Sequence, residues 1–397
     1  MANTLKFGNG QWATKEGSTL AYNDENGNFK PLPFNFERST SATRVNKDGL
    51  IEVVSNNEPR IDFKDDSNGA LLLEPSRSNI IYPSDIGNEG GSPVTSSSTI
   101  ISPMGDNTAW VPVATSGANR FEEAITGGTY STGQKLTYSW YRKRISTPQN
   151  SGYIGDLSVQ GLVNCTQVGS TTQIETGVNG FDRFQAVFSI TDGSAGTFIR
   201  LYFGNVIGVG NSSVAYWGHQ LEPNSSYATS YIPTQGSIGT RVAETASQTV
   251  PDGIIGQTEG TVFLDFKPQT LDGNSRYLSI ENSSSVGSGW FGVFASLLNG
   301  SIRFRFYGDG WDIDSSLIIE KGTRYKIAFS YKDGVQTSIY INGNLINNIT
   351  ASLSGKSYQK IRLSEGAIGV RGDADFNDIK LYDTIKTNQE LQALTKI

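Results

Sequence analysis

The stretch Phe36-Glu-Arg-Ser-Thr-Ser-Ala-Thr-Arg-Val-Asn-Lys-Asp-Gly-Leu-Ile-Glu52 indicates the fold class most directly. Two short strand-like runs flank Lys47-Asp48-Gly49, and an Asp-Gly pair favours a hairpin because glycine tolerates positive φ. A second distinctive stretch, Tyr216-Trp-Gly-His-Gln-Leu-Glu-Pro-Asn-Ser-Ser-Tyr-Ala-Thr-Ser-Tyr-Ile-Pro-Thr234, is typical of a strand with a Pro- and Ser-rich exit segment. Neither stretch has the pattern of an active site.

Composition also indicates an all-β chain. The 397 residues include 45 Gly, 17 Tyr and 19 Phe, which favour turns and pleated strands. This length exceeds the size at which single cores usually divide, so two or three domains are expected. The net charge of −6 leaves no basic field for a phosphate backbone, and nucleic-acid binding is not expected.

The termini and the cysteine content bear on location. The N-terminal residues lack the apolar stretch of a secretory signal, and no apolar run has the length needed to cross a bilayer. We therefore expect synthesis and assembly in a cytoplasm, without membrane insertion. Cys165 is the single cysteine, so an internal disulfide is excluded, and we expect a thiol without a chemical role.

The pattern of short strands divides the chain into three parts. Residues 1–78 contain short strand-like runs, such as Leu71-Leu72-Leu73, separated by polar turns. The segment as a whole is too short and too polar to form its own core. Residues 79–245 contain regular strands with Gly, Asn and Ser loops, which predict a two-sheet jelly roll. Four strands are expected there, at 135–143, 184–190, 197–203 and 214–221.

Residues 246–397 predict a second antiparallel sandwich after a small polar linker at 243–253. Its strands are expected at 260–266, 277–280, 290–294, 301–306, 325–331, 336–341 and 376–382. Asn342-Gly343 is a strong hairpin dipeptide between apolar strands. Thr387 with Glu390 forms a capping box, so a short helix is expected at the end of the chain.

Several of these sequence stretches resemble stretches of bacteriophage virion proteins, namely tail or head fibres and spikes with carbohydrate-binding β-sandwiches. The resemblance rests on 36–52 and 216–234, together with Pro59-Arg-Ile-Asp-Phe63 and Gly69-Ala-Leu-Leu-Leu-Glu-Pro-Ser-Arg-Ser-Asn79. The middle part is similar to a carbohydrate-binding module, and 255–397 resembles a laminin-G-like or concanavalin A-like lectin sandwich. The resemblance implies that 1–78 is an attachment segment that binds other virion proteins.

Oligomerisation follows from the same expectation about the N-terminal segment. If its ribbons cannot bury Ile51 and Leu71-Leu72-Leu73 within one chain, they would pair between chains. We therefore expect a homo-oligomer, and the analogy with phage fibres predicts a trimer. Multivalency would strengthen weak contacts with sugars.

Aromatic side chains are the main clue to a ligand. Sugar rings stack their C–H faces on Trp and Tyr while polar neighbours bind the hydroxyl groups. For any single aromatic residue, packing in the core is the competing explanation. The glycan-binding candidates are Trp290, Arg305, Tyr307, Asp309 and Trp311 in the third part, and Trp140, Arg142 and Tyr153 in the middle part.

Catalytic and metal sites have weaker signals. His219 is the only histidine, and we expect a partly exposed strand side chain without a catalytic role. Asp312 and Asp314 have the spacing of a glycosidase pair on one strand, but the adjacent glycines favour a loop. With Asp309 they also form a candidate calcium site, for which solvated acidic turns are the alternative. No other cofactor is expected.

The sequence therefore predicts a non-enzymatic virion fibre or spike protein that recognises glycans on a host surface. One alternative is a purely structural or decorating capsid or tail protein, because a fold alone does not fix a function. A second alternative is a glycan depolymerase or a binding module appended to one. The β-helix repeats typical of such depolymerases do not occur in this sequence.

Overall fold

The computed structural model describes residues 4–15, 17–25, 28–84, 94–96, 99–114, 118–126, 130–145, 158–207, 210–211, 214–269, 271, 274–282, 290–308, 311–353, 355–365 and 371–397. It confirms the all-β fold class: these residues form antiparallel strands and one helix. They divide into two compact units, of which unit 1 comprises Met1–Ser41, Val54–Pro75 and Val242–Ile397. Unit 2 comprises Ala42–Val53 and Ser76–Arg241. No helix in the described residues is long and apolar enough to cross a membrane.

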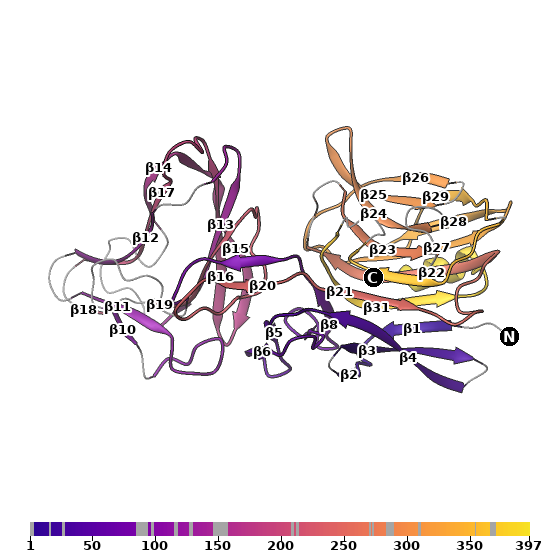
Figure 1. Cartoon of the computed structure of the whole chain (residues 1–397), viewed down its shortest axis with the longest axis horizontal. Helices are drawn as coiled ribbons and strands as arrows, with labels where there is room; N and C mark the ends of the chain where they lie inside the picture. Colours follow the sequence, from indigo (N-terminus) through magenta and orange to yellow (C-terminus); the bar gives the residue numbers. More distant parts are fainter. Residues whose placement is uncertain are drawn as a thin grey trace. The chain divides into compact units, whose positions relative to one another are not determined.

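Unit 1 is a sandwich of two antiparallel layers (Figure 1). One layer has the order β29-β28-β27-β22-β31-β1-β3, and the other has the order β26-β25-β24-β23-β30-β21-β4. Strand β4 also pairs with β3 and so connects the layers. The strands are β1 Thr4–Gly8, β2 Thr14–Lys15, β3 Ser18–Glu25, β4 Asn28–Glu37, β7 Ile61–Asp62, β8 Ala70–Leu73, β21 Thr245–Thr249, β22 Glu259–Pro268, β23 Arg276–Glu281, β24 Trp290–Leu298, β25 Ser301–Gly308, β26 Trp311–Ile318, β27 Tyr325–Lys332, β28 Gln336–Ile341, β29 Asn344–Thr350, β30 Lys360–Leu363 and β31 Ala374–Tyr382.

Aromatic side chains from both layers form the core of unit 1. Alternate residues of each strand point inward, because successive side chains of a strand lie on opposite faces. Phe306 of β25 packs edge-on against Phe329 of β27, with ring centroids 5.6 Å apart, and Phe304 meets Tyr325 at 5.0 Å. These contacts join the layers and leave the alternate residues of β24 and β25 on the outer face.

Two local predictions for unit 1 are confirmed. Asn342 and Gly343 both have positive φ and connect β28 to β29 as a two-residue hairpin. Helix α1, Asn388–Thr395, begins with the complete capping box of Thr387 and Glu390. Its Leu391 is buried against outward-facing residues of the first layer, so α1 covers part of that sheet.

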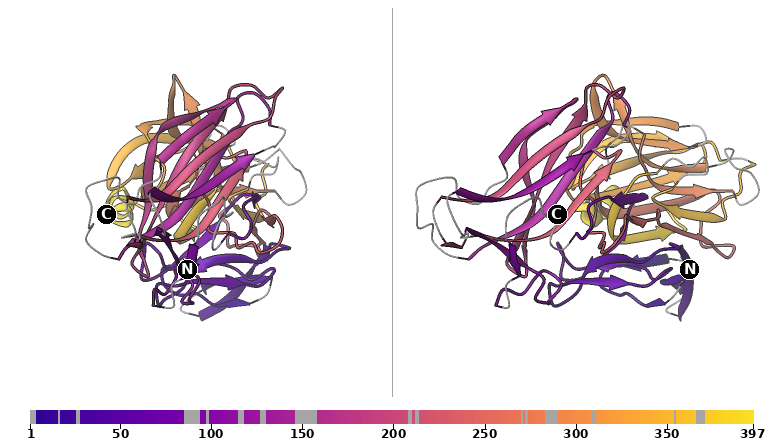
Figure 2. Two further views of the ribbon diagram at one scale, coloured as in Figure 1. Left: turned by 90° about the vertical axis from the view of Figure 1, so that its left-hand side faces the viewer. Right: turned by 60° about the vertical axis from the view of Figure 1, so that its left-hand side comes forward.

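Unit 2 is built from two main antiparallel sheets and two small two-stranded ones, β9 with β20 and β5 with β6, and Figure 2 shows the magenta and pink strands of the larger sheet side by side. The larger main sheet has the order β10-β11-β19-β13-β16-β15, with β18 also paired to β11, and the smaller has the order β12-β17-β14. Core residues of β13, β16, β17 and β19 belong to one cluster. The strands are β5 Ala42–Val45, β6 Ile51–Val54, β9 Arg77–Asn79, β10 Val94–Ser96, β11 Trp110–Ala114, β12 Ala118–Thr126, β13 Lys135–Arg144, β14 Ser158–Val163, β15 Cys165–Val178, β16 Phe181–Ile190, β17 Phe198–Ile207, β18 Gly210–Asn211, β19 Val214–Pro223 and β20 Gly239–Arg241.

The first 78 residues differ from the expected separate attachment segment. Strand β1 pairs with β31 in register Thr4↔Tyr382, and β8 pairs with the start of the same strand, Ala374↔Leu73. The predicted hairpin forms as β5 and β6, but it belongs to unit 2. Leu71 and Leu73 are fully buried within the single chain, so they need no second copy to cover them.

A buried network of ion pairs explains several charged residues of the distinctive N-terminal sequence. Arg38 Nη1 lies 2.7 Å from Glu244 Oε1, and Arg60 donates from Nε to the same oxygen at 2.7 Å. Arg60 also lies 2.8 Å from Glu74. Burial alone lowers the pKa of the Arg60 guanidinium, but Glu244 and Glu74 raise it above its usual value. These charged residues therefore hold the segments of unit 1 together.

Candidate functional site

The candidate site lies on the outer face of the second layer of unit 1. Phe291, Val293 and Ala295 of β24 point into the core, and Phe294 and Ser296 lie on the other face. Strand β25 alternates in the same way, with Arg303, Arg305 and Tyr307 outward. Because these residues stand on paired strands, the backbone fixes their spacing.

Register places an aromatic ring between two arginines on this face. Arg276 of β23 is opposite Phe294 of β24, and Phe294 is opposite Arg305 of β25. The guanidinium carbon of Arg276 lies 5.1 Å from the centroid of the Phe294 ring. That of Arg305 lies 5.5 Å from the centroid of the Tyr307 ring. The face therefore carries alternating cationic and aromatic groups.

The acids of β26 pair with the arginines of β25. Arg305 donates from Nε to Asp312 at 2.6 Å and makes a second bond to it through Nη2. Arg303 Nη1 donates to Asp314 at 3.0 Å. The hydrogen bonds from Arg305 hold the pKa of the Asp312 carboxyl below its usual value. Asp312 is therefore ionised at neutral pH.

A small cavity of about 250 Å³ opens on this face. Tyr307, one of its lining residues, is 37% exposed, so its side chain is accessible to a ligand. Aromatic rings beside fixed polar groups are suited to a polyhydroxylated ligand. The lining residues are Asn274, Arg276, Phe294, Ser296, Arg305 and Tyr307.

The structure brings four of the predicted site residues together: Arg305, Tyr307, Asp312 and Asp314. The expectation that Asp312 and Asp314 lie in a loop is wrong, because both belong to β26. Their alternate positions place both carboxylates on the outer face. The sequence missed Arg276, because only the pairing of β23 with β24 brings it to this face.

Trp311 lies in the core instead of on the binding face. It is 6% exposed, and its ring packs against Phe291 at a centroid distance of 5.6 Å. A Cβ at Gly308 would lie 2.4 Å from the Trp311 ring, so this glycine makes room for the tryptophan. Trp311 therefore cannot offer its ring face to a sugar.

The remaining glycan-binding candidates do not form a second site in the described residues. Trp140 is 1% exposed in the core of unit 2, so it is not a stacking surface. Arg142 lies with its guanidinium carbon 4.1 Å from the centroid of Phe184. Asp309 and Tyr153 lie outside the described residues, as does the side chain of Trp290.

The candidate calcium site does not form among the residues that can be placed. Arg305 binds both oxygens of Asp312, and Asp314 accepts from Arg303 through one oxygen and from the backbone N–H of Ser316 through the other, so these oxygens are already used by protein donors. Within the described ranges, no group of three or more His, Cys, Asp or Glu side chains is arranged to hold a metal ion. A calcium requirement has no support from these two acids.

His219 differs from its prediction because it is completely buried. Its Nδ1 lies 2.6 Å from the Tyr138 hydroxyl, and its ring stacks on Trp110 with centroids 5.4 Å apart. Burial lowers the pKa of His219 to about 3, so the imidazole is neutral at physiological pH. Cys165 is also buried, and burial raises the pKa of its thiol.

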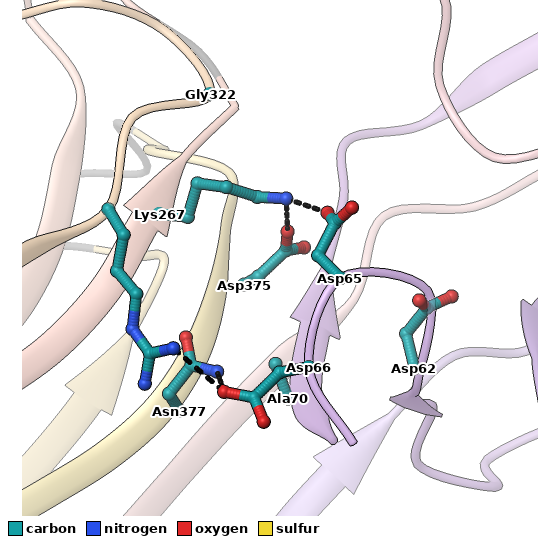
Figure 3. A pocket seen from close by; sticks show the side chains of 9 residues that line it. Asp62, Asp65, Asp66, Ala70, Lys267, Gly322, Asp375 and Asn377 are labelled. Carbon is teal, nitrogen blue, oxygen red and sulfur yellow. Dashed lines mark hydrogen bonds and ion pairs between the residues drawn. The ribbon is translucent and has the colours of Figure 1, made fainter. Parts of the chain in front are cut away.

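A second pocket, of about 300 Å³, lies on the outer face of the first layer of unit 1 (Figure 3). Lys267 of β22 binds Asp65 and lies 3.0 Å from Asp375 of β31. Burial opposes ionisation of Asp65, but Lys64 and Lys267 bring the pKa of its carboxyl below the usual value.

Further side chains of this acidic pocket, Arg324, Asp66 and Asn377, also bind one another. Arg324 Nη1 donates to Asp66 at 2.7 Å, and Asn377 Nδ2 donates to the same oxygen at 3.1 Å. Arg324 also binds both oxygens of Asp265. These bonds attach the loop between β7 and β8 to strands β22 and β31. The acidic pocket therefore has an evident structural role.

Comparisons with known proteins give no family for this chain. No family model matches the sequence, and a search of curated proteins found no significant match. Solved structures with partial similarity include the CBM40 of the Ruminococcus gnavus IT-sialidase, at 15% identity and a TM-score of 0.30. That similarity covers 36% of this chain and 85% of the module.

Two further structures are similar to a comparable extent. Domain 4 of AbnA, a GH43 extracellular arabinanase from Geobacillus stearothermophilus, has 16% identity and a TM-score of 0.31, over 44% of this chain and 84% of the domain. The binding domain of Botulinum neurotoxin DC has 13% identity and a TM-score of 0.30, over 38% of this chain and 39% of that domain. Similarity at this level establishes neither a family nor a ligand for this chain.

Proposed function

We propose that the chain recognises glycans, without catalysis, through the outer face of β23–β26. The observation that carries this proposal is the exposed side chain of Tyr307 beside the Arg305–Asp312 pair, with Tyr307 and Arg305 both lining a cavity. The ring supplies a stacking surface, and the charged pair supplies donors and acceptors for hydroxyl groups. Both stand on paired strands, which keep a binding site rigid.

The absence of catalysis is part of the proposal. A glycosidase needs one protonated carboxylic acid to donate to the leaving oxygen and a second carboxylate to act as nucleophile or base. Asp312 is held ionised by Arg305, and Asp314 is paired with Arg303. These interactions favour binding over hydrolysis at the two acids that the sequence suggested.

The biological setting that we propose is a bacteriophage fibre or spike in the virion. It rests on the resemblance of residues 36–52 and 216–234 to virion proteins. The predicted trimer rests on that resemblance alone, because one chain already buries Ile51 and Leu71–Leu73. Contacts with other virion proteins likewise stay a prediction, and sedimentation of the full-length protein would measure its oligomeric state.

The first test measures binding of the full-length protein to an immobilised panel of bacterial capsular and lipopolysaccharide glycans. We expect binding of at least one glycan, and Tyr307→Ala should weaken it about 10-fold, which corresponds to about 1.4 kcal/mol. Leu345→Ala is the matched control, because it truncates an exposed apolar side chain of β29 in the other layer. It should leave binding unchanged.

Three results would contradict the proposal. Failure to bind any glycan would favour the purely structural role, and equal losses in Tyr307→Ala and Leu345→Ala would remove the site assignment. Release of reducing ends from a bound polysaccharide by the wild type, abolished by Asp312→Asn with Asp314→Asn, would instead indicate a depolymerase. We expect no such release.

A further inference from the structure

Two arginines line the small cavity on the outer face of β23–β26. Arg276 and Arg305 lie there with the amide of Asn274 and the hydroxyls of Ser296 and Tyr307. A ligand in this arginine-lined cavity therefore meets two cations. The charge of the ligand that fits best depends on how the chain itself balances those cations.

Asp312 balances the charge of Arg305. Arg305 donates from Nε to one oxygen of Asp312 at 2.6 Å and from Nη2 to the other oxygen. These hydrogen bonds raise the pKa of the Arg305 guanidinium and lower the pKa of the Asp312 carboxyl, so both groups are charged at neutral pH. The two side chains therefore form a matched ion pair across β25 and β26.

Glu281 is the corresponding acid for Arg276. Both residues belong to β23, and Glu281 is buried. Burial lowers the pKa of the Arg276 guanidinium, and attraction by the Glu281 carboxylate opposes that effect. Glu281 also accepts from Arg362 Nε at 2.8 Å, and Arg362 Nη1 lies 3.9 Å from Oε2 of a further acid, Glu365. Each guanidinium of the cavity therefore has a carboxylate of the chain as its counter-charge.

This balance opposes the binding of a charged ligand group. A ligand carboxylate would be attracted by a guanidinium and repelled by the acid that balances it, so the two interactions largely cancel. It would also lose part of its hydration on entering the cavity, which is costly for an ion. A ligand ammonium group meets the same opposition with the signs reversed. The charge balance therefore favours a ligand without charge.

The hydroxyl groups of a neutral sugar can use both members of the Arg305–Asp312 pair. A guanidinium has five N–H donors and an ionised carboxylate has about four acceptor positions, and the pair uses two of each. The side chains of Arg305 and Asp312 are 36% and 50% exposed, so solvent reaches them. A hydroxyl group both donates and accepts, and it can therefore bind the guanidinium and the carboxylate together.

We propose that the arginine-lined cavity binds a neutral sugar residue and discriminates against acidic ones, because Asp312 and Glu281 already balance its two cations. This inference rests on the proposed function, because it assigns a sugar class to the same binding face. The volume of about 250 Å³ lies below the range of about 300–1,000 Å³ that is typical of pockets for drug-sized ligands, so it suits a single sugar residue.

The first measurement compares acidic glycans with their carboxyl-reduced forms, which keep the sugar skeleton but lose the charge. The full-length protein is tested on the glycan panel, with tetragalacturonate and a hyaluronan tetrasaccharide added as acidic probes. We expect no acidic form to bind more tightly than its reduced form, and binding of neutral glycans to change less than about 2-fold between about 50 mM and about 500 mM salt. An acidic form that binds more than about 3-fold more tightly than its reduced form would overturn the inference.

Asp312→Asn tests the cause of this preference, because it removes the balancing charge and keeps the size of the side chain. The variant should bind acidic forms about 5-fold more tightly than reduced forms at low salt, and this preference should disappear at high salt. Glu259→Gln is the matched control, since it removes one negative charge from a pair with Lys332 in the other layer. It should show no such preference.

The outcomes separate this inference from the proposed function. No preference for acidic forms in Asp312→Asn, or an equal preference in Glu259→Gln, would overturn the inference while glycan binding itself stands. If Asp312→Asn loses all glycan binding, the comparison of acidic and reduced forms on the wild type decides alone. Failure of the wild type to bind any glycan of the panel would overturn the proposed function itself.

Discussion

Strand β19 of unit 2 and strand β25 of unit 1 both carry alternating polar side chains, but the chain covers only one of these rows. Gln220 and Glu222 of β19 are fully buried, because the segment after the strand returns over them. Gln220 Oε1 accepts from Ile232 N at 2.7 Å, and Glu222 Oε2 accepts from Thr229 N at 3.0 Å. These side chains satisfy the backbone of the exit segment.

The outward row of β25 has a different kind of partner. The described partners of Arg303 and Arg305 are carboxylates of the neighbouring strand β26, and Tyr307 stays 37% exposed. A buried polar group without a partner costs about 1–3 kcal/mol, so the row of β19 is needed for folding. The described hydrogen bonds of Arg303 and Arg305 go to side chains of β26 and to no backbone group. The comparison therefore supports the proposal that the ligand site lies on β25, even though β19 has the more distinctive sequence.

The sharpest test of this comparison is Trp311→Ala. Trp311 and Tyr307 lie four positions apart on the hairpin of β25 and β26, but only Trp311 belongs to the core. Its removal should lower the free energy of unfolding of unit 1 by about 3–5 kcal/mol through lost burial and a cavity. Calorimetric melting of the full-length variant measures the effect.

Tyr307→Ala is the matched control for Trp311→Ala. Truncation of an exposed side chain should change stability by about 0.5 kcal/mol or less, while it weakens glycan binding. Equal losses of stability in the two variants would show that the hairpin does not separate core from surface as described. An unchanged melting temperature for Trp311→Ala would place its ring outside the core.

The second test removes a buried hydrogen-bonding side chain from β19. Gln220→Ala leaves the N–H group of Ile232 without its acceptor in a buried position, so unit 2 should lose about 1–3 kcal/mol of stability. Gln173→Ala on the exposed part of β15 is the control, with an expected change below about 0.5 kcal/mol. Similar melting temperatures for the two variants would mean that Gln220 does not fix the exit segment.

Local patterns in the sequence predicted much of the fold. The hairpin dipeptide Asn342-Gly343 requires two positive φ angles, and the capping box of Thr387 and Glu390 needs only neighbouring residues. The place of residues 1–78 was not predictable in this way. Pairing of Thr4 with Tyr382 joins residues from opposite ends of the chain, and no local signal encodes that register.

The same distinction explains the outcome for the site. The sequence could predict that Arg305, Tyr307, Asp312 and Asp314 lie near one another, because they are close in sequence. Arg276 was missed because cross-strand register alone brings it beside Phe294. Trp311 was predicted to bind a ligand because glycines beside an aromatic residue occur both in flexible binding loops and in tightly packed cores. The sequence cannot distinguish these two settings. The structure does, because the Trp311 ring packs against Gly308.

The third test uses the other face of β19, where His219 is buried and neutral. Its folded pKa of about 3 lies below the usual value of 6.5. A depressed pKa means that the unfolded chain takes up a proton that the folded chain does not. The resulting stability is therefore complete above about pH 6.5 and is lost as the pH falls below it, with a limiting slope of about 1.4 kcal/mol per pH unit.

His219 is the single histidine of the chain, so the window from pH 7 to pH 5 isolates its contribution from most carboxylates. We expect the stability of unit 2 to fall by about 1.4 kcal/mol between pH 6.5 and pH 5.5 at most, and His219→Phe to remove most of that dependence. Denaturant unfolding at several pH values measures the two slopes. The variant is compared by slope and not by absolute stability, because Tyr138 loses its partner in it.

Parallel slopes for wild type and variant, or an imidazole resonance that titrates near pH 6.5 in the folded protein, would contradict the buried neutral histidine. Either result would also weaken the contrast with β25, because a solvated His219 would leave β19 with an open polar group of its own.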